Sequence, residues 1–411
     1  MKKILFLLLI LLLGFGGYIL YTNHSRIPKL KIEDKVIDID KLYIYGSSFN
    51  MHGNQHDTDI QDLVLYNGEF TPVKINFTDD GFNLSNEVND GLYLDKIPRG
   101  KYYLFLRTTG KDKDNNDVYK YYAINNKTDY KTTTYYTFKD YNNKIFIDSD
   151  NEYSTLAFDI TKNNDEEVYD IVIDPGHGGM DSGASKYGYD EADFTMNLAM
   201  KLKNKLESNG FSVKLTREEK QLTKNDLLDE YGANGRAVIP HKVHAKYVIS
   251  LHMNSSDATS VNGIEVYTAK NINYSLAKEI AKSIVDVTGL NYSKNKISKI
   301  YDGVYTRTFT NYEIKNSNDK YINKNMKPYN ITTDSNYYYM IRETGGIVTG
   351  AFVDDRNKKI LGNPYVNSNV GVETYLLELG YITNKNDTYN MKNNTDKYAE
   401  AIYEAIKGLK K

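Results

Sequence analysis

One segment constrains the fold of this chain more than any other: residues 168–180, which read VYDIVIDPGHGGM. Residues 169–174 form a short apolar run rich in β-branched side chains, which is typical of a buried strand. Pro175 and three glycines then break the run and hold His177 in a tight loop. A histidine in such a loop is a better candidate for a ligand or a catalyst than for a packing residue.

Two later segments repeat this arrangement of a strand followed by a polar residue. Residues 246–251 (KYVISL) are closed by His252, and residues 374–379 (TYLLEL) contain Glu378. In an open parallel α/β sheet, ligands bind outside the carboxyl ends of the strands. We therefore expect these side chains to meet His177 in one cleft. Glu191 is a fourth candidate, because it lies where a loop enters a predicted helix.

Four motifs carry a resemblance to a known family. In this order, DPGHGG, the Glu191 loop, SLHMNS and ELGYITN resemble the zinc-dependent N-acetylmuramoyl-L-alanine amidases of the amidase 3 type. These bacterial enzymes cut the amide bond between N-acetylmuramic acid and the L-alanine of the stem peptide in peptidoglycan. The resemblance covers about residues 169–411. It implies that His177, Glu191 and His252 hold one zinc ion and that Glu378 is the catalytic base.

The residue types suit zinc-dependent amide hydrolysis. A catalytic zinc ion commonly has three protein ligands and keeps a fourth position for water, whose pKa it lowers towards ~7. A second carboxylate must then take the proton and later protonate the leaving amine, which is the role that suits Glu378. A structural ion pair in a core strand is the alternative for Glu378. The chain has no cysteine, so only His and carboxylate ligands are available.

Two further residues are candidates for substrate contacts. Asn254 follows His252 closely and could orient either the imidazole or the substrate, while a capping or surface role is equally open. Arg342, in the string IRET, resembles a family motif and could bind a substrate carboxylate. About 30 residues separate Arg342 from LLELG, which departs from the family pattern. The role of Arg342 therefore depends on how this insertion folds.

The chain is long enough for two domains, and its formal net charge of -2 gives no general attraction to nucleic acid. Residues 29–165 alternate apolar and polar side chains between turn signals, which predicts a β-sandwich-like module. This module could be a spacer or could bind the cell wall. His52 and His56 lie among turn residues in it, so we expect both on the surface.

Residues 166–411 alternate predicted strands and helices, which predicts an α/β catalytic domain with a mostly parallel sheet covered on both faces. Phe194, Leu198, Leu202 and Leu206 mark one amphipathic helix. Residues 234–245 also look helical. The histidines of that segment, His241 and His244, precede a strand and should lie away from the cleft. Residues 292–339 show little periodicity and are predicted to be irregular. The sequence predicts no role for this segment or for the other insertion, residues 345–371.

Residues 1–28 are predicted to be a membrane anchor or signal segment. Lys2 and Lys3 precede an unbroken apolar run of 18 residues, about the minimum for crossing a hydrocarbon core of ~30 Å. Without a convincing A-x-A cleavage site, an uncleaved single-pass anchor is favoured, with the catalytic domain on the extracytoplasmic face. Cleavage would instead give a secreted protein.

The sequence thus predicts a membrane-anchored zinc amidase whose partner is peptidoglycan. Two alternatives remain open. A zinc peptidase acting within the stem peptide would use the same ligands, and a non-catalytic wall-binding protein could be built on an amidase fold. Retention of all four polar residues argues against the second alternative, because binding alone does not need Glu378.

Overall fold

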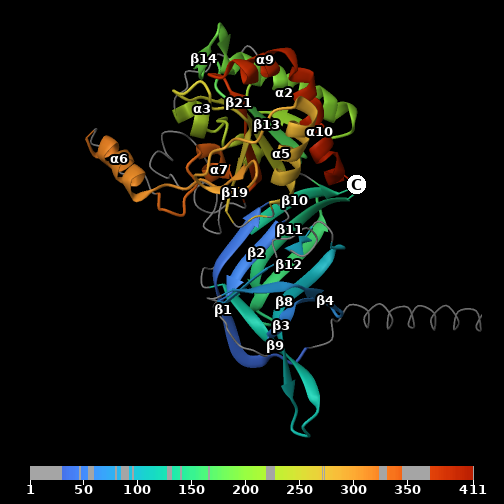
Figure 1. Cartoon of the computed structure of the whole chain (residues 1–411). Helices are drawn as coiled ribbons and strands as arrows, with labels where there is room; N and C mark the ends of the chain where they lie inside the picture. The colour runs from blue at the N-terminus through green and yellow to red at the C-terminus, as the bar shows by residue number, and fades with distance from the viewer. Residues whose placement is uncertain are drawn as a thin grey trace, which may run out of the picture.

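The computed structural model describes the residues in the following ranges: 30–45, 48–53, 60–78, 81–84, 92–94, 97–126, 132–138, 141–164, 167–218, 227–270, 272, 274–323, 331–344 and 371–410. Their buried apolar side chains form separate hydrophobic cores before and after the polar segment 161–167. Figure 1 shows a β-rich body in the first part of the chain and a mixed body in the second.

The N-terminal module is built from strands, as predicted. Its strands are β1 (Glu33–Tyr45), β2 (Ser48–Gly53), β3 (Ile60–Tyr66), β4 (Phe70–Val73), β5 (Ile75–Thr78), β6 (Gly81–Leu84), β7 (Leu92–Tyr93), β8 (Gly100–Lys111), β9 (Asp117–Asn126), β10 (Thr132–Phe138), β11 (Tyr141–Asp150) and β12 (Thr155–Lys162). They hydrogen bond into one branched sheet rather than into the two separate sheets of a sandwich. One branch point is the long strand β8, where β12 pairs with residues 100–103 and β9 with residues 105–111, while β3 pairs with residues 103–108.

The prediction for the histidines of the module was wrong in part. His52 lies in β2 and is only 5% exposed, because β2 continues through the residues that look like a turn in the sequence. His56 lies outside the described residues.

The second body contains the predicted α/β sheet. In spatial order its strands are β16 (Val213–Leu215), β13 (Ile171–Pro175), β17 (Tyr247–Asn254), β21 (Glu373–Tyr381), β18 (Glu265–Thr268), β20 (Val304–Tyr305) and β19 (Lys299–Tyr301). The four strands from β16 to β21 run parallel, which confirms a mostly parallel sheet. Strand β18 runs antiparallel to β21, a reversal that the alternation of elements does not predict. A short hairpin, β14 (Ser185–Lys186) with β15 (Tyr189–Asp190), lies outside this sheet.

Helices cover both faces of the sheet, as predicted (Figure 1). The larger core packs α2 (Glu191–Ser208), α5 (Ser275–Thr288) and α10 (Thr395–Ile406) against one face. A smaller core on the other face includes residues of α4 (Ile239–Lys242) and α7 (Tyr339–Thr344) with Val172 and Val248 of the sheet. The other helices among the described residues are α3 (Leu227–Tyr231), α6 (Asn311–Ile322), α9 (Lys385–Asn393) and the 3₁₀ helix η2 (Lys407–Lys410).

Helix α2 shows why the local prediction succeeds. The four apolar residues predicted to share one face, Phe194, Leu198, Leu202 and Leu206, are all 0% exposed. Burying each of them stabilises the packed helix by about 1.5–3 kcal/mol. The helix ends before Asn209 and Gly210, as predicted, and begins at Glu191. The packing of α2 against the sheet therefore fixes where the Glu191 side chain lies.

Two predictions of local structure were wrong. Within 234–245 only α4 is helical, because turns surround it and His244 adopts a left-handed conformation with φ of 47°. Residues 292–339 are more regular than expected, since they contain β19, β20, α6 and the start of α7. Short elements of this kind leave too little periodicity for detection.

Two predicted segments lie outside the described residues: the apolar run within residues 1–21, and residues 345–370 of the insertion before β21. Within the described part of the chain, which begins at Leu30, no helix has the length and apolar character needed to cross a membrane.

Candidate metal centre

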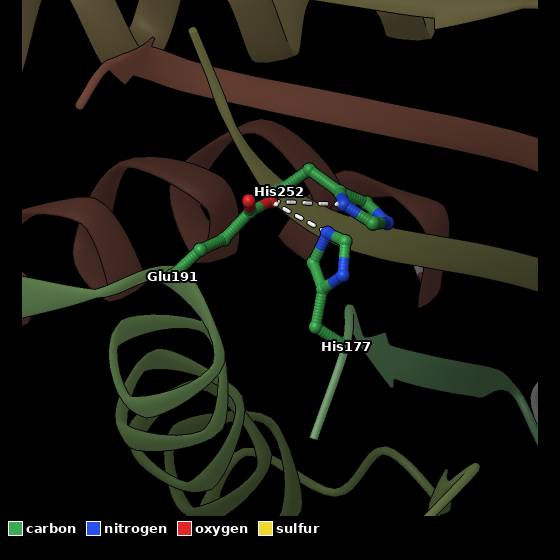
Figure 2. Close-up of side chains that lie close together, drawn as sticks. All are labelled: His177, Glu191 and His252. Carbon is green, nitrogen blue, oxygen red and sulfur yellow. Dashed lines mark hydrogen bonds and ion pairs between the residues drawn. The ribbon is translucent and has the colours of Figure 1, made fainter. Parts of the chain in front are cut away.

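His177, Glu191 and His252 come together at one edge of the sheet, as the sequence predicts (Figure 2). His177 follows the carboxyl end of β13, and His252 lies near the carboxyl end of the neighbouring parallel strand β17. Glu191 is the first residue of α2. One ligand-type atom from each of the three side chains lies within 4.8 Å of the others.

Glu191 is the centre of this cluster. Its Oε1 atom is 3.1 Å from Nε2 of His177 and 3.1 Å from Nδ1 of His252 (Figure 2). The backbone N–H of Met253 also donates to Oε1, at 2.8 Å, and that of Ala184 donates to Oε2, at 3.0 Å. The carboxylate is thus held by groups from β17 and from the segment before α2, and only 4% of its side-chain surface is exposed.

His177 is held by its backbone and by Asp181. Its φ of 60° lies in the left-handed region, which is uncommon for residues other than glycine and is often found at functional sites. Oδ2 of Asp181 accepts a hydrogen bond from Nδ1 of the imidazole over 2.7 Å. With Nδ1 bonded to Asp181, the other ring nitrogen, Nε2, faces Oε1 of Glu191 at 3.1 Å. A carboxylate behind a histidine ligand is the usual arrangement around a protein-bound metal ion.

Gly176 allows His252 to approach the loop. A Cβ atom on residue 176 would lie 2.4 Å from Cε1 of His252, which is closer than real atoms pack. The absence of a side chain at this position therefore lets the imidazole lie directly against the loop backbone. This explains one of the glycines in DPGHGG.

The charges of the cluster shift the pKa values of its members in opposite directions. Burial alone lowers the pKa of His177, but the hydrogen bonds and negative charges of Glu191 and Asp181 raise it to about 9. Burial alone raises the pKa of Glu191, yet the two imidazoles lower it well below its usual range. Glu191 is therefore ionised throughout the physiological range.

The donor set fits a zinc ion. Two imidazole nitrogens and a carboxylate oxygen are the ligand types of catalytic zinc sites, which leave a fourth position open. The side chains of His177 and His252 keep exposed fractions of 26% and 17%, so water and substrate can reach them. The carboxylate oxygen lies between the two nitrogens as a shared partner.

Glu378 lies beside this cluster. It is paired in register with His252 on the neighbouring parallel strand, so that their side chains project from the same face of the sheet, with the strands about 4.8 Å apart. Glu378 is 8% exposed, and its Oε2 atom has no hydrogen-bond partner among the described residues. Burial and the carboxylates of Glu191 and Glu265 raise the pKa of Glu378 well above its usual range.

Glu265 is the residue that sequence reasoning missed. It lies in β18 directly across from Glu378 and is fully buried. Its carboxylate accepts hydrogen bonds from the hydroxyl groups of Tyr267 and Tyr381, at 2.5 and 2.8 Å, and from the amide of Asn254 at 3.3 Å. The sequence did offer one signal for Glu265, which is a carboxylate inside an apolar strand. Such a residue is rarely buried unless it is paired or functional.

The other predicted site residues hold different contacts. Nδ2 of Asn254 donates to Glu265, and Oδ1 of Asn254 accepts from the backbone of Ser255. The guanidinium of Arg342 donates to Glu343 at 2.7 Å and to the backbone oxygens of residues 336 and 337. The substrate roles of Asn254 and Arg342 stay predictions.

His241 lies apart from the metal cluster. It is buried, and its Nε2 atom is 3.4 Å from the backbone oxygen of Glu343. Burial lowers its pKa to about 4. Among the described residues, the one group of side chains placed to hold a metal ion is His177, Glu191 and His252.

Comparison with known proteins decides the family. The family model described as N-acetylmuramoyl-L-alanine amidase matches residues 171–408, which is more than half of the chain. The chain belongs to this amidase family. It is an N-acetylmuramoyl-L-alanine amidase, a hydrolase of the bacterial cell wall.

Individual relatives match the same part of the amidase. A protein of Buchnera aphidicola named "Putative N-acetylmuramoyl-L-alanine amidase" is 27% identical over 249 residues, which cover 57% of this chain and 94% of that protein. The "Probable cell wall amidase LytH" of Staphylococcus epidermidis is 34% identical over 117 residues, 28% of this chain and 36% of LytH.

A solved structure also resembles the chain. That of the N-acetylmuramoyl-L-alanine amidase AmiC2 of Nostoc punctiforme has 24% sequence identity and a TM-score of 0.37, covering 59% of this chain and 97% of AmiC2.

Proposed function

We propose that this amidase cleaves the bond between N-acetylmuramic acid and L-alanine with the help of one zinc ion held by His177, Glu191 and His252. The observation that carries the proposal is the convergence of two imidazoles on one carboxylate oxygen, with 3.1 Å to each nitrogen. When bound, zinc supplies a Lewis acid that polarises the amide carbonyl and lowers the pKa of water to about 7.

Glu378 is proposed as the general base and then the general acid. Its position beside His252 and its unpartnered Oε2 atom leave a carboxylate oxygen free to accept a proton from the attacking water. Burial and the neighbouring carboxylates raise the pKa of Glu378, which makes its carboxylate a stronger base towards the attacking water. As the C–N bond of the amide breaks, Glu378 passes this proton to the nitrogen of the leaving L-alanine, so that the products are a carboxylic acid and a free amine and Glu378 is a carboxylate again.

His177 is held for its proposed ligand role by Asp181. The carboxylate of Asp181 accepts a hydrogen bond from Nδ1–H, which leaves Nε2 as the nitrogen that would bind the metal ion. The same carboxylate accepts the backbone N–H of Gly183 at 3.0 Å, which ties the loop before α2 to the imidazole. These contacts keep two of the proposed ligands in place before an ion arrives.

The proposed function is tested by the products formed from purified peptidoglycan. We expect the full-length chain to release stem peptides with a free L-alanine N-terminus, as identified by mass spectrometry. Peptides cut at an internal bond would instead indicate a zinc peptidase. Binding of peptidoglycan without any product, by a zinc-loaded chain, would indicate a wall-binding protein.

We also infer that residues 1–28 anchor the amidase in the cytoplasmic membrane, with residues 166–411 on the extracytoplasmic face and peptidoglycan within reach. The support is the lysine-flanked apolar run of 18 residues. N-terminal sequencing of the membrane fraction should find the segment still attached. A mature protein that begins after residue 21 would show cleavage and secretion instead.

A further inference from the structure

Two buried arginines lie behind the loop that carries His177. Arg217 follows β16, and Arg236 lies in the turns before α4; they are 4% and 7% exposed. A buried guanidinium group is costly unless its donors find partners. Here the partners are mostly backbone oxygens of residues 175–177, the loop that holds His177.

Arg217 connects two of the three segments that carry the proposed ligands. Its Nε atom donates to the oxygen of Pro175 at 3.1 Å, and its Nη2 atom lies 3.5 Å from the oxygen of Gly176. The same Nη2 atom donates to the oxygen of Ala192 at 3.3 Å, in the first turn of α2. One rigid side chain thus links the His177 loop to the helix turn that begins with Glu191.

Arg236 connects the loop to the centre of the sheet. Its Nη1 atom donates to the oxygen of Pro175 at 2.7 Å and to Oδ1 of Asp174 at 3.2 Å, while Nη2 donates to the oxygen of His177. Asp174 also accepts hydrogen bonds from Thr216 and Ser250, which belong to the strand regions on either side of β13. The loop is therefore fixed relative to three neighbouring segments.

The conformation of the loop creates the need for these donors. Residues 177, 178 and 179 all have positive φ values, of 60°, 119° and 64°. The chain therefore leaves the strand here, and its carbonyl groups turn away from the ladder partners that would otherwise satisfy them. Guanidinium groups suit this task because each offers five donors in one plane, whereas a lysine offers a single compact charge.

We propose that Arg217 and Arg236 are positioning residues that hold the His177 loop against the start of α2 and so set the affinity of the site for its metal ion. The inference rests on the proposed zinc site. Neither guanidinium is a ligand. Arg217 acts through the backbone of the His177 loop and of the first turn of α2, and Arg236 acts through the His177 loop and Asp174.

Gly178 gives independent support for this role. A Cβ atom on residue 178 would lie 2.6 Å from Cζ of Arg217, so the loop backbone lies directly against the guanidinium plane. The residue also has a φ of 119°, which side chains rarely adopt. The glycine next to His177 thus leaves room for an arginine from another strand.

The alternative is that Arg217 and Arg236 only stabilise the fold. Arg342 is the matched control for this alternative. Arg342 is also buried, at 7% exposed, and also donates to two backbone oxygens, those of residues 336 and 337, at 3.1 and 2.8 Å. Its partners lie outside the ligand-bearing segments. Removing Arg342 should therefore destabilise the fold without changing the metal site.

The experiment compares zinc dissociation constants of the purified full-length chain, measured by competition with a chelator. Arg217→Met and Arg236→Met should each bind zinc at least about 10-fold more weakly than the wild type, the loss usual for groups that orient metal ligands. Arg342→Met should bind zinc as tightly as the wild type. The visible spectrum of the cobalt-substituted protein should change in the first two variants and not in the third.

Arg217→Lys and Arg236→Lys keep the buried charge and serve as variants that are easier to fold. They should show a smaller loss of zinc affinity in the same direction. Folded Lys variants with wild-type affinity and an unchanged cobalt spectrum would overturn the proposal, as would an equal loss in Arg342→Met. A wild-type chain that binds no zinc would contradict the proposed function itself.

Discussion

Two buried glutamates, Glu191 and Glu378, lie at the same edge of the sheet, but their hydrogen-bond partners and neighbouring charges differ. Glu191 is surrounded by donors: two imidazoles and the backbone N–H groups of Met253 and Ala184. Glu378 has an oxygen without a hydrogen-bond partner among the described residues, and the carboxylates of Glu191 and Glu265 lie near it.

The difference explains why the same residue type can serve two roles. The donors around Glu191 lower its pKa, which suits a permanently ionised ligand. Burial and the neighbouring negative charges raise the pKa of Glu378, which suits a group that gains and loses a proton. Pairs of groups whose pKa values are pushed apart are a general mark of acid and base assignments in active sites.

The largest expected effect comes from removing the two imidazoles that surround Glu191. The double variant His177→Ala, His252→Ala should no longer bind zinc stoichiometrically and should show no measurable turnover, because only one proposed ligand remains. Metal analysis of the purified protein checks this result. His241→Ala, which removes a buried imidazole outside the cluster, is the matched control and should keep its zinc. Stoichiometric zinc in the double variant would place the metal site elsewhere.

The second largest effect tests whether Glu191 is a zinc ligand. Glu191→Gln keeps the size of the side chain but removes its negative charge, so zinc affinity should fall by at least about 10-fold, with turnover falling alongside. Chelator competition and assays at increasing zinc concentrations measure the two effects. If Glu191→Gln binds zinc as tightly as the wild type, the carboxylate is a hydrogen-bonding group and not a ligand.

A smaller effect tests the neighbour of Glu378. The negative charge of Glu265 raises the pKa of Glu378, so Glu265→Gln should lower that pKa. Glu378 would then stay deprotonated to a lower pH, and the acidic limb of the kcat/KM profile should move to lower pH. An unchanged acidic limb in a folded variant would mean that Glu265 serves only to hold Asn254 and the two tyrosines.

Much of this site could be predicted from sequence because its residues follow strands. His177, His252 and Glu378 each stand at or near the end of an apolar run, and the parallel order of β13, β17 and β21 brings these ends to one edge. The helix with Glu191 at its start was equally readable, because Phe194, Leu198, Leu202 and Leu206 show a clear helical period.

The remaining features depend on contacts between segments far apart in the chain. Glu265 faces Glu378 because β18 runs antiparallel to β21, and no local pattern specifies that direction. Arg217 and Arg236 look like ordinary surface cations in the sequence, yet they are buried against the His177 loop. Elements such as α4, β19 and β20 are too short to show a periodic pattern in the sequence.

Glu378→Gln provides the most direct test of the central claim, which is that the partnered glutamate binds metal and the unpartnered one moves the proton. Turnover and zinc content should be measured on the same preparation. The account predicts that turnover falls by at least ~10² to 10⁴, the contribution of positioned proton transfer, while zinc content and folding stay near those of the wild type. Loss of zinc would make Glu378 a ligand, and near-normal turnover would place the general base elsewhere.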